Sequence, residues 1–292
     1  MPLSALLFTG KVILCKRFSS YPLVKYYENK FIEKISKFIR MCYDTIKMKG
    51  VFRVHIHFII HEVFEGPGAF LTWAKMRGHS IGYSRVYKGE PLPLSFEQID
   101  LLIVMGGPQS PSTTIEMCPH FDGAAEIALI KKCIDLNKAV IGVCLGAQLI
   151  GEAYGARCVK SPEKEIGGFP VFLTEEGKDH RFFSHFDNGC MVGHWHNDMP
   201  GLTEKSQVIA YSEGCPRQII QYGTFVYGFQ CHMEFTHELV ELLIEHSEAE
   251  LREDKERKFV QQPDVLRNND YTTMNDKLYV FLDLLTKEYL HQ

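Results

Sequence analysis

Apolar runs and amphipathic stretches alternate along the chain from Val51 onward. A short apolar run between turn residues predicts a buried strand, whereas apolar residues spaced three or four apart predict a helix. We therefore expect strands at Val54–Ile60, Ile81–Val86, Leu101–Met105, Ala139–Val143 and Phe225–Gln230. Helices are expected from Gly66 to about Arg77, at Asp122–Leu136, at Thr236–His246, and from about Asn275 onward.

This alternation of strands and helices is typical of an α/β fold. We predict an open, mostly parallel sheet with helices on both faces. Gly168–Gln230 contains shorter apolar runs and predicts a small mixed or antiparallel addition. Ser247–Asp270 is charged and predicts irregular structure. The last helix carries an apolar stripe that must pack on the body, formed by Leu278, Phe281, Leu282, Leu285 and Tyr289.

The first 50 residues differ in charge from the rest, with ten basic and three acidic side chains. Phe31–Arg40 has the spacing of a short amphipathic helix. A mitochondrial presequence would also be basic, but the Tyr-rich, Ser-poor composition argues against one. We expect residues 1–50 to be a poorly ordered extension, or to precede a true start at Met48. Residues 51–292 are then the functional domain.

Composition narrows the class of protein. The 292 residues are 45% hydrophobic and 23% charged, as in an ordinary globular protein of one large or two small domains. A net charge of -4 gives no electrostatic case for binding nucleic acid. No apolar run approaches the roughly 20 residues that span a membrane. The 9 cysteines include no Cys-x-x-Cys pair, and with no secretory signal they indicate a reducing, cytoplasmic location.

Cys144 stands in the most informative stretch of the chain. The frame Gly142-Val-Cys-Leu-Gly146 follows an apolar strand and precedes a helix, as in a nucleophile elbow. A helix N-terminus favours a thiolate over a thiol, and a thiolate with a histidine in reach attacks carbonyl carbon. Most free cysteines are small buried hydrophobic residues, and the other eight lack this frame.

His232 and Glu234 offer the base that such a cysteine needs. They follow the buried strand that ends near Gln230, and in an extended chain residues two apart point to the same side. A carboxylate there accepts the second ring N–H, fixes the tautomer and supports the imidazolium. The alternative is a surface histidine beside a surface glutamate, which the elbow makes the weaker interpretation.

Four motifs together resemble class I, triad-type glutamine amidotransferases, in particular stand-alone proteins similar to the glutaminase half of GMP synthase. In family order they are Met105-Gly-Gly-Pro108 with Ser110, Gly142–Gln148, His194-Trp-His-Asn-Asp198 and Gly228–Glu234. The resemblance runs from about Val51 to the C-terminus and implies a flavodoxin-like fold. The cysteine elbow and the His-x-Glu pair carry most of its specificity.

The resemblance implies a role for each matching position. Cys144 would be the nucleophile, His232 the general base and then acid, and Glu234 the group that orients the ring. The backbone N–H groups of Gly107 and Leu145 would form the oxyanion hole. This agrees with elementary geometry, because the residue after a nucleophile presents its amide to the developing oxyanion.

Three further positions are expected to bind substrate. Gln148 lies at i+4 from Cys144 on the same helix face, and in the family this position contacts glutamine. Asp198 belongs to the His-x-Asp stretch that lines the pocket in relatives. Glu165 stands in a Lys-Glu-Ile-Gly stretch, and it would hold an α-ammonium group. A helix glutamine without a ligand and a solvated loop charge are the alternatives for Gln148 and Glu165.

We expect no metal and no cofactor. His194 and His196 alternate on a predicted strand, but the sequence offers no third ligand at suitable spacing. The expected reaction is cleavage of the γ-amide of glutamine or of another γ-glutamyl compound. The roughly 58 residues after Glu234 hold no ATP-binding module or Gly-rich phosphate loop. Either a separate synthetase receives the ammonia, or the protein is a γ-glutamyl peptidase acting on peptides or glutathione conjugates. A non-catalytic binding module and a redox-sensing thiol are the rival classes.

Overall fold

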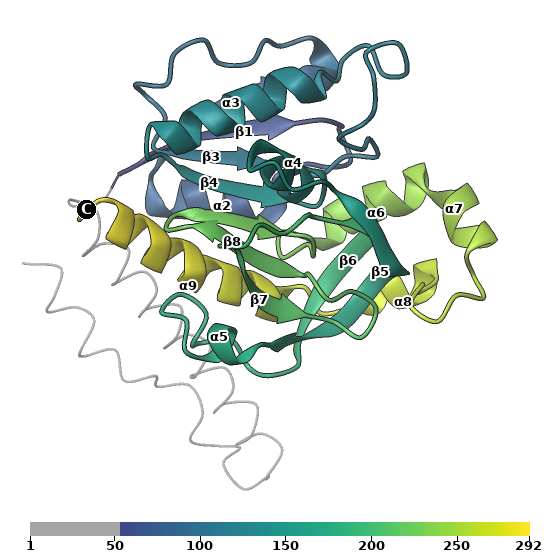
Figure 1. The fold of residues 1–292 in the computed structure, drawn as a ribbon. Helices are drawn as coiled ribbons and strands as arrows, with labels where there is room; N and C mark the ends of the chain where they lie inside the picture. Colours follow the sequence, from purple (N-terminus) through teal and green to yellow (C-terminus); the bar gives the residue numbers. More distant parts are fainter. Residues whose placement is uncertain (1–52) are drawn as a thin grey trace, which may run out of the picture. The chain divides into compact units, whose positions relative to one another are not determined.

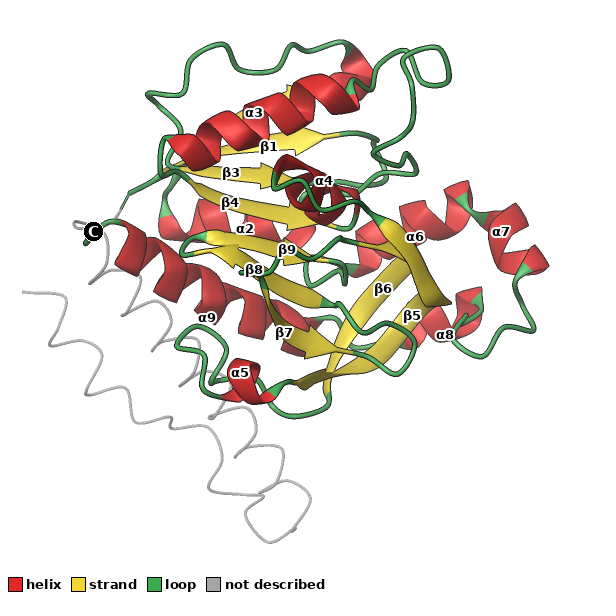
Figure 2. Ribbon diagram, viewed as in Figure 1, coloured by secondary structure: helices red, strands yellow, loops and turns green. Residues whose placement is uncertain are grey.

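The computed structural model describes residues 53–292, whose strands form one nine-stranded sheet in the order β2-β1-β3-β4-β9-β8-β7-β5-β6 (Figure 1, Figure 2). The strands are β1 His55–Ile60, β2 Ser80–Arg85, β3 Leu101–Val104, β4 Ala139–Val143, β5 Val159–Leu173, β6 Cys190–Met199, β7 Gln207–Tyr211, β8 Ile219–Gly223 and β9 Val226–Phe229. The expectations for residues 1–50, including the Phe31–Arg40 helix and Met48, lie outside the described residues. The boundary of the functional domain at residue 51 stays a prediction.

The parallel half of the sheet runs from β2 to β9. Every residue of β3 and β4 is buried, because helices cover both faces of a parallel sheet. In the β4–β9 pair, Val140 lies opposite Val226 and Val143 opposite Phe229. Both strands therefore end at the same edge, where the chain continues into Cys144 from β4 and towards His232 from β9.

Helices cover both faces of this half, as predicted (Figure 1). On one face α3 and α4 pack against Leu102, Val104 and Val140. On the other face α2 and α9 share a core with Ile56 and Phe58. The helices are α2 Gly68–Arg77, α3 Gly123–Asp135, α4 Leu145–Ala153, α5 Glu175–Lys178, α6 His237–His246, α7 Glu248–Glu253, α8 Pro263–Asn268 and α9 Thr272–Tyr289, with a 3₁₀ turn η2 at Val86–Lys88.

The second half of the sheet is antiparallel, from β9 through β8, β7 and β5 to β6. This confirms the predicted mixed addition and corrects two local predictions. The stretch around Glu165 is not a loop but part of the long strand β5, which has an irregularity between Lys160 and Glu165. The stretch 247–270 contains α7 and α8, each anchored by a buried leucine, Leu251 and Leu266.

The apolar stripe of α9 packs on the body as predicted. Phe281 is fully buried, with its ring centroid 4.9 Å from that of Phe183 and 5.2 Å from that of Phe229. We expect Phe281→Ala to lower the free energy of unfolding by about 3–5 kcal/mol, because it leaves a cavity among rings that cannot collapse fully. Urea unfolding measures this value. Val280→Ala, at a neighbouring side chain that is 42% exposed, should change it by less than about 0.5 kcal/mol.

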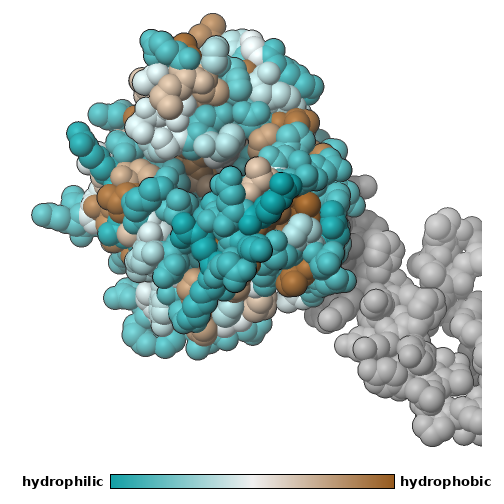
Figure 3. All heavy atoms as spheres, turned by 90° about the vertical axis from the view of Figure 1, so that its right-hand side faces the viewer, coloured by the Kyte–Doolittle hydropathy of each residue, from teal (hydrophilic) through white to brown (hydrophobic). Residues whose placement is uncertain are grey.

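Among residues 53–292, no helix has the length and apolar character needed to cross a membrane. The face that carries α7 is mostly hydrophilic, with hydrophobic residues in small separate groups (Figure 3). Scattered apolar side chains of this kind are normal on protein surfaces.

Candidate active site

Cys144 occupies a strained turn between β4 and α4. It is the N-cap residue of α4 and has a φ of 49°, a left-handed value that non-glycine residues rarely adopt. The flanking glycines make this turn possible. A Cβ on Gly142 would lie 2.3 Å from the Gly146 carbonyl, and a Cβ on Gly146 would lie 2.1 Å from the Val104 carbonyl. Such strain is retained at functional sites when the surrounding packing enforces it.

The sulfur of Cys144 borders a cavity of about 210 Å³ and is not sealed in the core. The residue is 7% exposed. Its Sγ accepts a hydrogen bond of 3.3 Å from the Gln230 side-chain amide and lies 3.7 Å from the carbonyl oxygen of Trp195. The sulfur thus lies at the N-terminus of α4, with one amide donor and one carbonyl oxygen beside it.

His232 and Glu234 form a buried pair at the same edge of the sheet. His232 Nδ1 lies 2.7 Å from Glu234 Oε1, as expected for side chains two residues apart. The exposed fractions are 0% and 2%, so the alternative of a surface pair does not apply. Burial lowers the pKa of His232, but the charge of Glu234 and the proximity of Cys144 outweigh burial and raise it well above its usual value. His232 Nε2 has no hydrogen-bond partner among the described residues.

Two backbone amides next to the sulfur are free to bind an oxyanion. Within residues 53–292, neither the Leu145 nor the Gly107 N–H donates a hydrogen bond. Gly107 lines the cavity, and a Cβ there would lie 3.0 Å from the Leu145 side chain, so the two residues are close neighbours. The oxyanion-hole role of the two amides stays a prediction.

A buried histidine holds the Gly106–Gly107 peptide in place. His61 Nδ1 donates to the Gly106 carbonyl oxygen at 2.9 Å, and Nε2 lies 2.9 Å from Glu126 Oε2. Burial lowers the pKa of His61, but the charge and hydrogen bond of Glu126 outweigh burial and raise it. In a trans peptide the C=O and N–H groups point in opposite directions, so this contact directs the Gly107 N–H away from His61.

Gln148 and Asp198 both line the cavity with Cys144. Gln148 is 4% exposed and donates to Gln230 at 3.2 Å, so one of its contacts is internal. Asp198 is half-buried, and its carboxylate lies 3.0 Å from Lys160 Nζ. The structure therefore brings these two predicted positions to the sulfur, each with a protein partner.

Glu165 does not reach the cavity. It is fully buried, and its carboxylate accepts hydrogen bonds from Ser212 at 2.8 Å and Gln218 at 2.6 Å. Its other neighbours are His194, at 3.7 Å, and His196, at 3.2 Å, and of these two His196 lines the cavity. Glu165 is thus neither a solvated loop charge nor placed to touch an α-ammonium group in this cavity; it supports His196 from behind.

Glu165 is a third potential metal ligand beside His194 and His196, which the spacing of residues in the sequence did not reveal. Ligand atoms of Glu165, His194 and His196 lie within 4.8 Å of one another. The carboxylate of Glu165 is already engaged by Ser212 and Gln218, so these residues form a hydrogen-bonded network beneath the cavity. Burial lowers the pKa of His194 to about 4, which keeps this ring neutral at neutral pH.

Two residues near the sulfur were missed by sequence reasoning, namely Glu65 and Gln230. Gln230 was detectable in principle, as a polar side chain at the end of an apolar strand two residues before His232. Glu65 carried no local signal, because only the fold brings the loop after β1 to this cavity, where Lys164 of the Lys-Glu-Ile-Gly stretch also lies.

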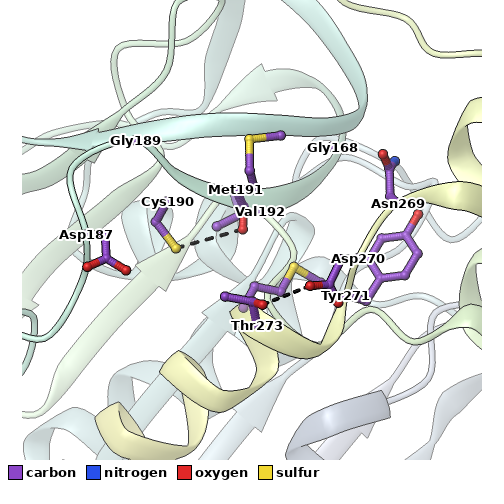
Figure 4. A pocket seen from close by; sticks show the side chains of 11 residues that line it. Gly168, Asp187, Gly189, Cys190, Met191, Val192, Asn269, Asp270, Tyr271 and Thr273 are labelled. Carbon is purple, nitrogen blue, oxygen red and sulfur yellow. Dashed lines mark hydrogen bonds between the residues drawn. The ribbon is translucent and has the colours of Figure 1, made fainter. Parts of the chain in front are cut away.

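A second cavity of about 300 Å³ lies between β6 and the start of α9 (Figure 4). Met191, Val192 and Met274 contribute apolar surface, and the carboxylate of Asp270 is bound by the Thr273 hydroxyl at 2.8 Å. None of the predicted site residues lines it. The smaller cavity at Cys144 is therefore the candidate active site.

Comparison with known proteins decides the family. The family model "Glutamine amidotransferase class-I" matches residues 80–245. The chain belongs to this family. The class I amidotransferase fold accordingly confirms the predicted α/β architecture, with its central parallel strands and helices on both faces.

Three known proteins are similar to this chain in sequence or in fold. The glutamine amidotransferase-like protein YfeJ of Salmonella typhimurium is 55% identical over 233 residues, which are 80% of this chain and 98% of YfeJ. SMU.1228c, whose crystal structure is known, is 51% identical in sequence to this chain. The two structures match with a TM-score of 0.78 over 80% of this chain and 100% of SMU.1228c. A glutamine amidotransferase from Thermotoga maritima shares the fold at 24% identity and a TM-score of 0.71, over 80% of this chain and 99% of that chain.

Proposed function

We propose that this protein hydrolyses the γ-amide bond of glutamine or of a γ-glutamyl compound through a γ-glutamyl thioester. The observation that carries the proposal is the arrangement at one sheet edge. A strained, cavity-facing Cys144 stands beside a His232–Glu234 pair, with two unoccupied backbone amides next to the sulfur. Family membership supports the same reaction class.

The geometry suggests the following steps. Cys144, as a thiolate, attacks the γ-carbonyl carbon, and the Gly107 and Leu145 amides stabilise the resulting oxyanion. Each such donor is worth on the order of 3 kcal/mol. The C–N bond then breaks as His232 transfers a proton to the departing nitrogen, which leaves as ammonia or an amine. Water, deprotonated by His232, attacks the thioester, and glutamate departs as the sulfur is restored.

Labelling with a glutamine-derived chloromethyl ketone tests the proposal. We expect one adduct, on Cys144, and loss of glutamate release in step with labelling, because the pocket presents the electrophile to an activated sulfur. Peptide mass spectrometry locates the adduct. Cys158 is a matched internal control, since burial and nearby acids raise the pKa of this half-buried thiol to about 12 and keep it protonated.

The other classes predict different results. A non-catalytic binding module gives no adduct on Cys144 and no glutamate from any γ-glutamyl compound. A redox-sensing thiol is oxidised reversibly without hydrolysis. Comparing glutamine with glutathione conjugates then separates the two enzymatic alternatives: ammonia transfer to a separate synthetase favours glutamine, and a γ-glutamyl peptidase favours the conjugates.

A further inference from the structure

Glu65 is a buried carboxylate in the cavity that the proposed mechanism does not use. It lies on the loop between β1 and α2, is 8% exposed, and lines the cavity with Cys144. Within residues 53–292, its side chain makes no hydrogen bond or ion pair. The other carboxylates of the cavity differ in this respect, because Asp198 pairs with Lys160 at 3.0 Å and Glu250 pairs with Lys164 at 2.6 Å.

Glu65 as a residue is nine-tenths buried, and a carboxylate without a protein partner in such surroundings is costly for the empty protein. Burial raises the pKa of Glu65 to about 7; the positive ring of His232 opposes this effect and the charge of Glu234 adds to it. A buried polar group without a partner calls for an explanation, and a bound ion or ligand group is one. The complementary group is an N–H donor or, better, a cation.

The position of Glu65 indicates which part of a substrate it meets. A Cβ placed on Gly106 would lie 2.5 Å from Glu65 Oε2 and 3.3 Å from His232 Cε1. The carboxylate and the ring therefore both lie against Gly106, and Glu65 also lines the cavity that holds Cys144. In the proposed mechanism His232 protonates the departing nitrogen, so this nitrogen must lie within hydrogen-bond reach of the ring. Glu65 thus faces the departing amine, whereas the glutamyl part bonds to Cys144.

We propose that Glu65 forms a subsite for the departing amine, and that the preferred substrates are γ-glutamyl amides whose amine carries a second, positively charged nitrogen. This inference rests on the proposed function. A cationic amine supplies the missing partner of Glu65, while a neutral amine leaves the carboxylate unpaired. A departing group with a carboxylate, such as the glycine end of a γ-glutamyl peptide, brings two like charges together in a poorly solvated space.

A matched series of γ-glutamyl amides tests the subsite. The three substrates are γ-glutamyl-ethylenediamine, γ-glutamyl-propylamine and γ-glutamyl-glycine, whose departing groups are similar in size but cationic, neutral and anionic. We expect kcat/KM to fall in that order, with about a tenfold to hundredfold difference between the first two, as for a hydrogen bond to a charged group. Release of glutamate measures all three in one assay.

The variant Glu65→Gln keeps the shape and removes the charge. It should bring the ratio of cationic to neutral kcat/KM close to 1 and raise turnover of the glycine compound. Glu65→Asp should keep part of the cationic preference. Glu248→Gln, at an exposed carboxylate next to Ser247 of the cavity wall, is the matched control and should leave the ratio unchanged. The melting temperature of Glu65→Gln should not fall, because an unpaired buried charge is removed.

The ratio of kcat/KM for the cationic amide to kcat/KM for the neutral amide should also depend on pH. Glu65 is ionised mainly above its pKa of about 7, so the cationic preference should be larger at pH 8 than at pH 6 and flat in Glu65→Gln. The titratable groups that face Glu65 are His232, Glu234, His61 and Glu62, and the Glu65→Gln variant separates their titration from that of Glu65. If all three amides are cleaved with the same ranking in Glu65→Gln, the subsite is refuted while the proposed function stands. If none is cleaved and Cys144 is not labelled, the proposed function itself fails.

Discussion

Cys144→Ala is expected to lower glutamate release by about 10⁴-fold or more, because nothing else in the cavity can form the thioester. The elbow itself should persist. It is fixed by the contacts of Gly142 and Gly146 with the neighbouring backbone, and the contacts of the sulfur with Gln230 and Trp195 are long, at 3.3 and 3.7 Å. Steady-state assays on glutamine and on γ-glutamyl amides, together with urea unfolding, measure both effects.

Cys158→Ala is the matched control for this loss. Its thiol is half-buried outside the cavity, and the variant should retain ordinary activity. Turnover of Cys144→Ala within tenfold of the unchanged protein would show that the sulfur is not the nucleophile. A loss of folding in Cys144→Ala would instead point to a packing role.

Glu234→Gln is expected to reduce kcat by about 10³-fold to 10⁴-fold with little effect on KM. The carboxylate fixes the His232 tautomer and supports the imidazolium, and an amide does neither reliably. Because the charge of Glu234 raises the pKa of His232, its removal should lower that pKa. The imidazolium is then lost at a lower pH, so the alkaline limb of the pH profile of the residual activity should move to lower pH.

Glu238→Gln provides the comparison for this variant. Glu238 is exposed in the first turn of α6, four residues away in sequence, and should leave both kcat and the pH profile unchanged. An unchanged alkaline limb in Glu234→Gln would mean that Glu234 does not control the protonation of His232. A fall in stability without a shift of the limb would indicate a structural role only.

The parallel core was predictable from the sequence because its signals are local. The strands β3 and β4 are uninterrupted apolar runs, and the glycines around Cys144 have one geometric explanation. Similarly, His232 and Glu234 alternate with apolar residues, which places them on one side of an extended chain. Each of these inferences uses residues within a few positions of one another.

The features that the sequence did not predict depend on contacts between segments far apart in the chain. The charge of Glu165 suggested a solvated loop, but Ser212 and Gln218, about fifty residues away, satisfy it in the interior. The helices α7 and α8 each contain six residues, too short for a clear periodic pattern, and one buried leucine holds each in place. Glu65 becomes notable only because its surroundings provide no partner.

Side chains of α7 and of the residue that follows it hold part of the cavity wall in place. Glu250 on α7 accepts a hydrogen bond from the Trp195 indole at 3.2 Å and pairs with Lys164, which also contacts Asp254 just after the helix. A single short helix thus clamps the rim of β5 and β6 through side chains alone. Exchanging these few half-buried residues offers a way to widen or narrow the entrance, and so to change which molecules enter the cavity, without altering the buried residues of the sheet.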